Sequence, residues 1–265
     1  MPRHPGLVLV AHRYDAESTA HVQALADGAG IPARMAAVAS GACDGVGMAV
    51  EALVDERCDA ITIVPLMASS ESGLVRDVAA MAAPLAARHG VAIALASALD
   101  DAPEVVAVLS DRASALADHA SRQAVMLVGH GPARDEEMPA WEQLGMTIAN
   151  GVKERGRFCA VRAGVVRDDA PAAVRTAAVR AVRERIARYA VDTGEPVIVV
   201  PWLVGAGRLT RVRLLQDLAE LDIRYEGKPM LPHAALGDWL ARELAVASMV
   251  LTRAKPGTVV RLREH

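Results

Sequence analysis

Short apolar runs alternate with stretches of helical spacing along the 265-residue chain, and this alternation constrains the fold more than any other feature. A run such as 124–128 or 60–66 is hydrophobic at almost every position, which is typical of a strand buried on both faces of a sheet. Strands that alternate with helices form parallel sheets covered by those helices, so the sequence predicts an α/β fold. We expect strands at 6–10, 31–38, 60–66, 91–96, 124–128, 159–165, 197–200 and 222–225, and helices at 16–26, 46–54, 74–89, 103–117, 141–155, 172–189, 210–221 and 235–248. The closing VVRLREH segment is compatible with either an edge strand or a frayed tail.

The two halves of the chain carry the same order of motifs. GLVLVAHRYDAES and AVMLVGHGPARDEE each place a histidine, His12 or His130, between an apolar run and a polar, acidic helix start. AITIVPLMASSESG and PVIVVPWLVGAGRLT each lead from an apolar run through Val-Pro into a loop before a helix. The repeat is too long for a solenoid and indicates an internal duplication of whole domains. We therefore expect two similar domains, residues 1–120 and 121–265, each with a parallel sheet flanked by helices.

His12 and His130 each follow a predicted strand, at the sheet edge where open α/β proteins bind their ligands. The glycines around His130 predict a tight turn, and the acidic run 135–137 suits the start of the next helix. Imidazole is the commonest metal ligand among side chains and a suitable general base near neutral pH. A plain polar turn residue is an equally simple interpretation of either histidine, and the residues alone leave both open.

The loop after the first Val-Pro offers Ser69 and Glu71 as polar candidates. The carboxylate of Glu71 suits a metal ion or a proton-transfer step, and the hydroxyl of Ser69 suits a polar ligand. A third histidine, His233, stands just before the last predicted helix. By itself, His233 is typical of a helix-capping or surface residue.

The loop after the second Val-Pro predicts an acidic organic ligand. Gly205 and Gly207 precede a helix, where glycine-rich turns expose backbone N–H groups to anions. Arg208 follows, with Arg211 and Arg213 just beyond, and their forked donors suit carboxylates. Trp202 is the large side chain available to contact such a ligand. The competing interpretation of the arginines is a solvated helix face.

Composition narrows the class of partner. The hydrophobic fraction of 52% is sufficient for a sizeable core, while the net charge of −3 gives no reason to expect nucleic acid or a membrane surface. No apolar run is long enough to span a bilayer, and the first apolar segment is too short for a signal peptide. The three cysteines form no CxxC pair, so a reducing cytoplasm is the simplest compartment.

The ordered motifs resemble the class II chelatases, the sirohydrochlorin cobalto- and ferrochelatases of cobalamin and sirohaem biosynthesis. LVGHGPARDEE is the closest piece, and PVIVVPWLVGAG and LPHAALGDWLARE follow it in order. The resemblance covers most of the chain as two tandem chelatase-like halves. It implies two similar α/β domains that face one another across a cleft. It also implies a lyase reaction without a nucleotide, in which a divalent metal held by histidines enters a tetrapyrrole as its pyrrole protons are removed.

On this resemblance, the site residues acquire roles. His12 and His130 are expected to be metal ligands or proton acceptors, with Glu71 as a second catalytic group and His233 as a further ligand. The metal would be cobalt, iron or nickel, because nitrogen ligands accept each of them. The partner would be a carboxylated tetrapyrrole or another acidic small molecule, bound by a monomer or a homodimer. The expected ligand-binding residues are Ser69, Trp202, Gly205, Gly207, Arg208 and Arg211.

The chain departs from the family at the loop that carries a second metal-binding histidine. The equivalent positions fall near Gly73 and Leu209, which are not metal ligands, and Arg13–Tyr14 replace a glycine and a small residue after the first histidine. The two strand-end histidines are therefore expected either to share one metal ion, helped by Glu71 or His233, or to bind none. Three hypotheses follow: a metal chelatase, a degenerate chelatase that binds or delivers a metal or tetrapyrrole, and a different enzyme on the same scaffold.

Overall fold

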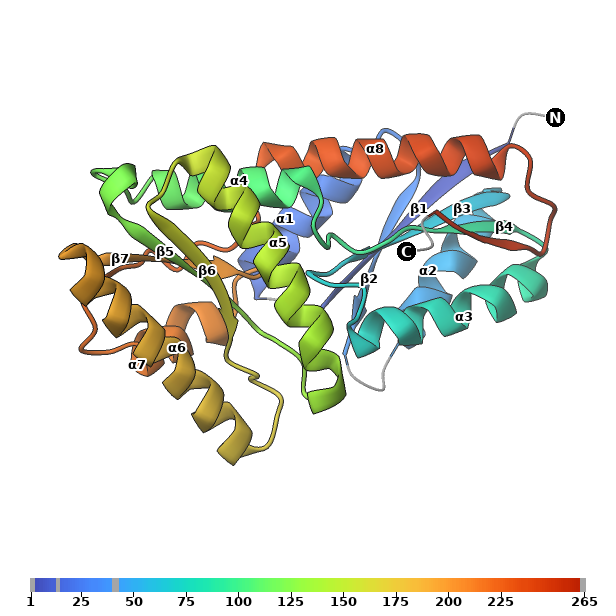
Figure 1. The fold of residues 1–265 in the computed structure, drawn as a ribbon. Coiled ribbons are helices and arrows are strands. Elements are labelled where there is room, and N and C mark those ends of the chain that lie inside the picture. Colours follow the sequence, from blue (N-terminus) through green and yellow to red (C-terminus); the bar gives the residue numbers. More distant parts are fainter. Residues whose placement is uncertain (1–2, 13–14, 40–42, 263–265) are drawn as a thin grey trace. The chain divides into compact units, whose positions relative to one another are not determined.

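The computed structural model describes residues 3–12, 15–39 and 43–262, and these form two compact α/β units (Figure 1). Unit 1 comprises residues 1–100 and 236–265, and unit 2 comprises residues 101–235. Each unit contains a parallel sheet flanked by helices, so the predicted fold class is confirmed. The division differs from the expected 1–120 and 121–265, because the end of the chain returns to the first unit.

Unit 1 contains a five-stranded sheet in the order β2-β1-β3-β4-β9, with every neighbouring pair parallel. Strands β2 and β3 lie on opposite sides of β1 and run parallel to it, so the chain must cross the sheet between successive strands. The crossovers contain the helices that cover the sheet. The elements of this unit are β1 (Pro5–His12), α1 (Ala16–Asp27), β2 (Ala33–Val38), α2 (Asp44–Asp55), β3 (Ala60–Leu66), α3 (Gly73–His89), β4 (Ala92–Leu95), α8 (Ala234–Leu251) and β9 (Val259–Arg261).

Helix ends in unit 1 follow local chemistry. The Asp15 side chain accepts a hydrogen bond from the Ser18 backbone N–H at 2.9 Å and so caps α1. Gly90 ends α3 with a φ of 64°, a left-handed conformation that glycine adopts without strain. Helices α2 and α3 pack on one face of the sheet through aliphatic residues that include Val50, Leu53, Val78, Leu85, Ile61 and Ile63.

The last helix, α8, covers the sheet of unit 1, and the last strand, β9, joins that sheet; neither belongs to the sheet of unit 2. Ala247 and Leu251 of α8 pack against the strand alanines Ala60, Ala92 and Ala94, whose small side chains allow a close approach (Figure 1). Strand β9 then pairs with β4 as an edge strand. The first of the two interpretations of the closing segment is thus confirmed for residues 259–261, and residues 263–265 lie outside the described part of the chain.

Unit 2 contains a four-stranded parallel sheet in the order β6-β5-β7-β8. This order repeats that of β2-β1-β3-β4 in unit 1, and its origin by duplication remains a prediction. The elements are α4 (Pro103–Ser114), η1 (Ala120–Arg122), β5 (Ala124–Gly129), η2 (Asp135–Glu137), α5 (Met138–Gly156), β6 (Ala160–Val165), α6 (Ala172–Thr193), β7 (Val197–Trp202), η3 (Leu209–Arg213), α7 (Leu214–Asp217) and β8 (Ile223–Arg224).

The segment expected to be one helix at 210–221 takes a different form. Its first turn, η3, is a π-helix, and only Leu214–Asp217 are α-helical. The Thr210 hydroxyl accepts a hydrogen bond from the Gly207 N–H and donates one to the Gly207 carbonyl, both at 3.0 Å. Tyr225 donates a hydrogen bond from its hydroxyl to the Thr210 carbonyl at 2.5 Å. These contacts are consistent with a widened turn, which is often found near functional sites.

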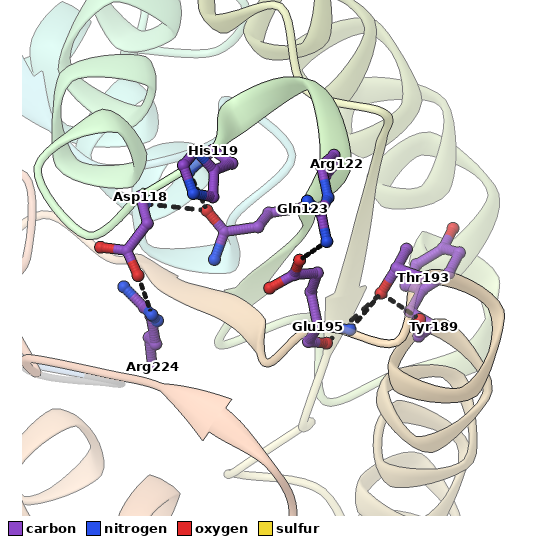
Figure 2. A network of polar contacts seen from close by, with 8 residues as sticks. All are labelled: Asp118, His119, Arg122, Gln123, Tyr189, Thr193, Glu195 and Arg224. Carbon is purple, nitrogen blue, oxygen red and sulfur yellow. Dashed lines mark hydrogen bonds and ion pairs between the residues drawn. The ribbon is translucent and has the colours of Figure 1, made fainter.

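A polar network stabilises the amino ends of the strands in unit 2 (Figure 2). The Gln123 side chain is fully buried, and its Oε1 accepts hydrogen bonds from the backbone N–H groups of Asp118 and His119 at 2.9 and 3.0 Å. Arg224 of β8 pairs with Asp118, and Arg122 pairs with Glu195 at 2.5 Å. The network ties the segments before β5 and β7 to β8, at the end of the sheet opposite to the histidine.

We expect Gln123→Ala to destabilise the protein. The substitution leaves two backbone N–H groups without their acceptor, a loss of about 1–3 kcal/mol in the free energy of unfolding. The matched control is Gln143→Ala, since Gln143 is exposed on α5. Urea denaturation of both variants measures the difference, and equal midpoints for Gln123→Ala and wild type would contradict this role.

Within the described residues, no helix is both long and apolar enough to cross a membrane. The cytoplasmic location expected from the sequence remains a prediction.

Candidate functional site

His130 is the first residue after β5, at the carboxyl edge of the sheet in unit 2. Strand β5 lies between β6 and β7, so the chain crosses to one side of it and then to the other. The carboxyl edge at such a switch in strand order is where open α/β proteins bind ligands. The predicted position of His130 at a ligand-binding edge therefore agrees with the topology of unit 2.

Two glycines shape the turn that presents His130. Gly131 has a φ of 77°, and a Cβ there would lie 2.5 Å from the Cβ of Val165 on β6. A Cβ at Gly129 would lie 2.9 Å from the Trp202 ring on β7, the residue paired with it in the sheet. Close packing thus requires glycine on both sides of the histidine, and the backbone conformation requires it at Gly131 as well.

The imidazole of His130 has a defined proton arrangement. Its Nδ1 lies 2.9 Å from the Gly131 carbonyl oxygen, which can only accept, so Nδ1 carries the proton and donates. In the neutral ring, Nε2 then carries the lone pair. Nε2 lies 3.5 Å from a carboxylate oxygen of Asp169, in the loop after β6. The side chains of His130 and Asp169 are 35% and 67% exposed.

This pair has the electrostatics of a cation or proton site. A nitrogen lone pair and a carboxylate both accept, so they repel one another unless a proton or a cation lies between them. Partial exposure allows an ion to reach both groups from solvent. The Nδ1–H contact with a backbone carbonyl is the kind of outer interaction that orients metal-binding histidines.

Asp168, in the loop after β6, anchors η3, which follows β7, to that loop. It accepts hydrogen bonds from Arg213 of η3 at 2.5 Å and from Arg175 of α6 at 2.9 Å. Arg175 also pairs with Asp217 of α7 at 2.6 Å. Burial alone favours the protonated acid, but the two guanidinium groups outweigh it and hold the pKa of Asp168 below its usual range.

In unit 1, His12 is the last residue of β1 and is exposed, and the altered Arg13–Tyr14 pair lies outside the described residues. His12 and His130 belong to different units, so the expectation that they share one metal ion stays a prediction. In the loop after β3, Glu71 is exposed and Ser69 is 1% exposed. The Ser69 hydroxyl accepts a hydrogen bond from the Glu71 N–H at 3.1 Å, a contact internal to the loop.

The loop after β7 differs from its predicted form at two residues. Trp202 is 1% exposed and packs on Trp141, with ring centroids 5.4 Å apart, so it belongs to the core of unit 2 rather than to an open ligand surface. The Gly207 N–H donates to Thr210 and is not available to an anion. Gly205 is buried, whereas Arg208 and Arg211 are exposed as expected.

His233 has a structural role in place of the expected metal ligation. Its Nδ1 accepts a hydrogen bond from the Ala235 N–H at 3.2 Å, at the start of α8. The proton of the neutral ring is then on Nε2, which lies 3.4 Å from the Asp111 carboxylate. Both nitrogens are therefore engaged, and neither lone pair remains for a metal ion.

Sequence reasoning missed Asp168 and Asp169. The signal was present, since both follow β6, the strand next to β5, and the carboxyl ends of neighbouring parallel strands meet at one edge. Within the described ranges, no three His, Cys, Asp or Glu side chains form a group able to hold a metal ion.

Comparison with known proteins gives a family match in the first part of the chain and structural matches over most of it. Residues 6–116 match the CbiX family model. SirB from Bacillus subtilis, solved with Fe3+, has a TM-score of 0.72 at 17% identity, over 97% of this chain and 100% of SirB. CbiX, described as the terminal enzyme for biosynthesis of siroheme in denitrifying bacteria, has a TM-score of 0.58 at 16% identity, over 92% and 99% of the two chains.

A third solved structure extends the comparison. DR2241 from Deinococcus radiodurans is described as a multi-domain protein similar to chelatases, with two additional domains. It matches with a TM-score of 0.59 at 17% identity, over 91% of this chain and 55% of its own. No curated protein sequence matches the chain significantly. Residues 6–116 thus match the CbiX family model, as the motifs led us to expect, and the chain as a whole has a fold similar to those of SirB and CbiX.

Proposed function

We propose that the protein is a chelatase that inserts a divalent metal ion into a carboxylated tetrapyrrole, with His130 and Asp169 as the pair that receives the metal. The observation that carries the proposal is the pairing of Nε2 of His130 with the Asp169 carboxylate at the carboxyl edge of the sheet. The chelatase fold and the CbiX match support the reaction class.

A pair of protein ligands suits a metal that is a substrate. A resident structural ion is usually enclosed by four protein ligands, whereas an ion that must be passed on needs open positions for water and for the acceptor. Imidazole and carboxylate together accept cobalt, nickel and ferrous iron. The metal is therefore expected to bind reversibly at the turn after β5.

Insertion also requires a base, because the pyrrole nitrogens lose their protons as the metal enters the macrocycle. Once the metal has left, Nε2 of His130 again has a lone pair and can accept one of these protons, and the other passes to water. The exposed Arg208 and Arg211 are the proposed partners of the macrocycle's carboxylates. Arg213 is already committed to Asp168 and is not assigned this role.

We expect Asp169→Asn to weaken Co2+ binding by about 10–100-fold, since it removes the charge and one ligand atom beside His130. Isothermal titration calorimetry measures the dissociation constant. The matched control is Asp192→Asn, an exposed aspartate at the end of α6, which should bind as wild type does.

Equal affinity in Asp169→Asn and wild type would contradict the proposed pair. A protein that binds Co2+ through the pair but never accelerates insertion would instead be a metal or tetrapyrrole delivery protein. A protein that binds neither the metal nor a tetrapyrrole would be a different enzyme on the same scaffold.

A further inference from the structure

Arg167 holds the turn that presents His130, and it does so from the loop that carries Asp169. Its backbone N–H donates to the His130 carbonyl at 2.7 Å. Its Nε and Nη2 donate to the carbonyls of Pro132 and Ala133, both at 2.9 Å. Its Nη1 pairs with the Asp135 carboxylate at 2.6 Å. One residue thus contacts most of the 130–135 turn.

The cost of this arrangement suggests a function beyond general stability. Arg167 is 8% exposed, and burying a guanidinium is unfavourable unless its donors are satisfied. Its φ is 52°, in the left-handed region that a non-glycine residue adopts only with backbone strain. Such strain clusters at sites where a particular geometry is needed.

The contacts of Arg167 lie on both sides of the carbonyl that accepts from His130. The Gly131 carbonyl, which accepts from Nδ1, lies between His130 and Pro132, and Arg167 binds the carbonyls of both of these residues. Asp169 follows Arg167 by two positions in the same loop. Arg167 therefore fixes both the orientation of the imidazole and its position relative to the carboxylate.

We infer that Arg167 is a positioning residue, which aligns Nε2 of His130 with Asp169 for metal binding without touching the metal itself. The inference rests on the proposed function of this pair. It assigns to a buried arginine the role that outer-shell partners have in metal sites, where their removal costs about 10–100-fold in affinity or activity.

Arg167→Gly is the sharpest test, because glycine adopts the observed φ without strain while the guanidinium is removed. We expect this variant to fold and to bind Co2+ about 10–100-fold more weakly than wild type by calorimetry. Arg167→Lys keeps the charge but lacks the planar fork, so its affinity should lie between the two. The control is Arg162→Ala, an exposed arginine on β6 whose guanidinium bonds to the Val161 carbonyl, and its affinity should equal that of wild type.

Amide hydrogen exchange of residues 130–135 in the metal-free protein gives a second readout. Faster exchange in Arg167→Gly together with weaker Co2+ binding supports the inference. Unchanged affinity overturns it, even if exchange is faster, because the role would then be structural only. If wild type binds no Co2+, the proposed function and this inference are both overturned, whereas unchanged affinity in Arg167→Gly overturns the inference alone.

Discussion

His130→Ala should abolish metal binding while leaving the fold intact. The side chain is 35% exposed and its contacts are with the next residue and Asp169, so its removal leaves no cavity in the core. Loss of the nitrogen ligand itself should weaken Co2+ binding by more than about 100-fold, beyond the effect of an outer-shell change. Calorimetric titration measures the affinity, and thermal unfolding checks the fold.

The matched control is His119→Ala. His119 is exposed in the same unit, at the opposite end of the sheet, and it bonds to Gln123 and Arg122 of the network in Figure 2 through its backbone N–H and carbonyl. We expect wild-type affinity for Co2+ in this variant. Retention of affinity in His130→Ala would place the metal elsewhere in the chain and would remove the basis of the proposed site.

Gly131→Ala should be among the most destabilising single methyl additions in unit 2. The new Cβ would lie 2.5 Å from the Val165 Cβ, and the backbone φ of 77° is unfavourable for alanine. Overpacking and left-handed strain together predict a loss of about 3 kcal/mol in the free energy of unfolding. Denaturation in urea measures it, with the slope compared to confirm two-state behaviour.

Two further glycines separate the causes of that loss. Gly194 has a φ of 68° with nothing within 4 Å of its Cβ position, so Gly194→Ala isolates the conformational cost, about 1–2 kcal/mol. Gly207 has neither a positive φ nor a close neighbour, and Gly207→Ala should change stability by no more than about 0.5 kcal/mol. Equal stability of all three variants would show that the turn around His130 is not constrained as described.

The alternation of apolar runs and helices was sufficient to predict the fold class, because the inner strands β1, β3, β5 and β7 are buried almost throughout and short loops leave few topologies. It did not predict that α8 and β9 complete the sheet of unit 1. That choice depends on the small side chains of Ala60, Ala92 and Ala94, which admit α8, and such tertiary packing has no local signal.

The candidate site shows the same limit. The position of His130 followed from its strand and its glycines, whereas its partner Asp169 depends on which strand lies beside β5. His233 was expected to be a ligand only from the family resemblance; by itself it was expected at a helix cap or on the surface, and its nitrogens contact the start of α8 and Asp111. Trp202 looked like a ligand contact, but it packs in the core because Gly129 and Gly145 leave room for its ring.

The most direct test of the proposed function is metal insertion by the purified protein. Sirohydrochlorin is mixed with Co2+, Fe2+ or Ni2+, and the change in its absorption spectrum is followed against the uncatalysed reaction. We predict acceleration with at least one metal, lost in His130→Ala and retained in His119→Ala. An insertion rate equal to the uncatalysed one with all three metals would contradict the account.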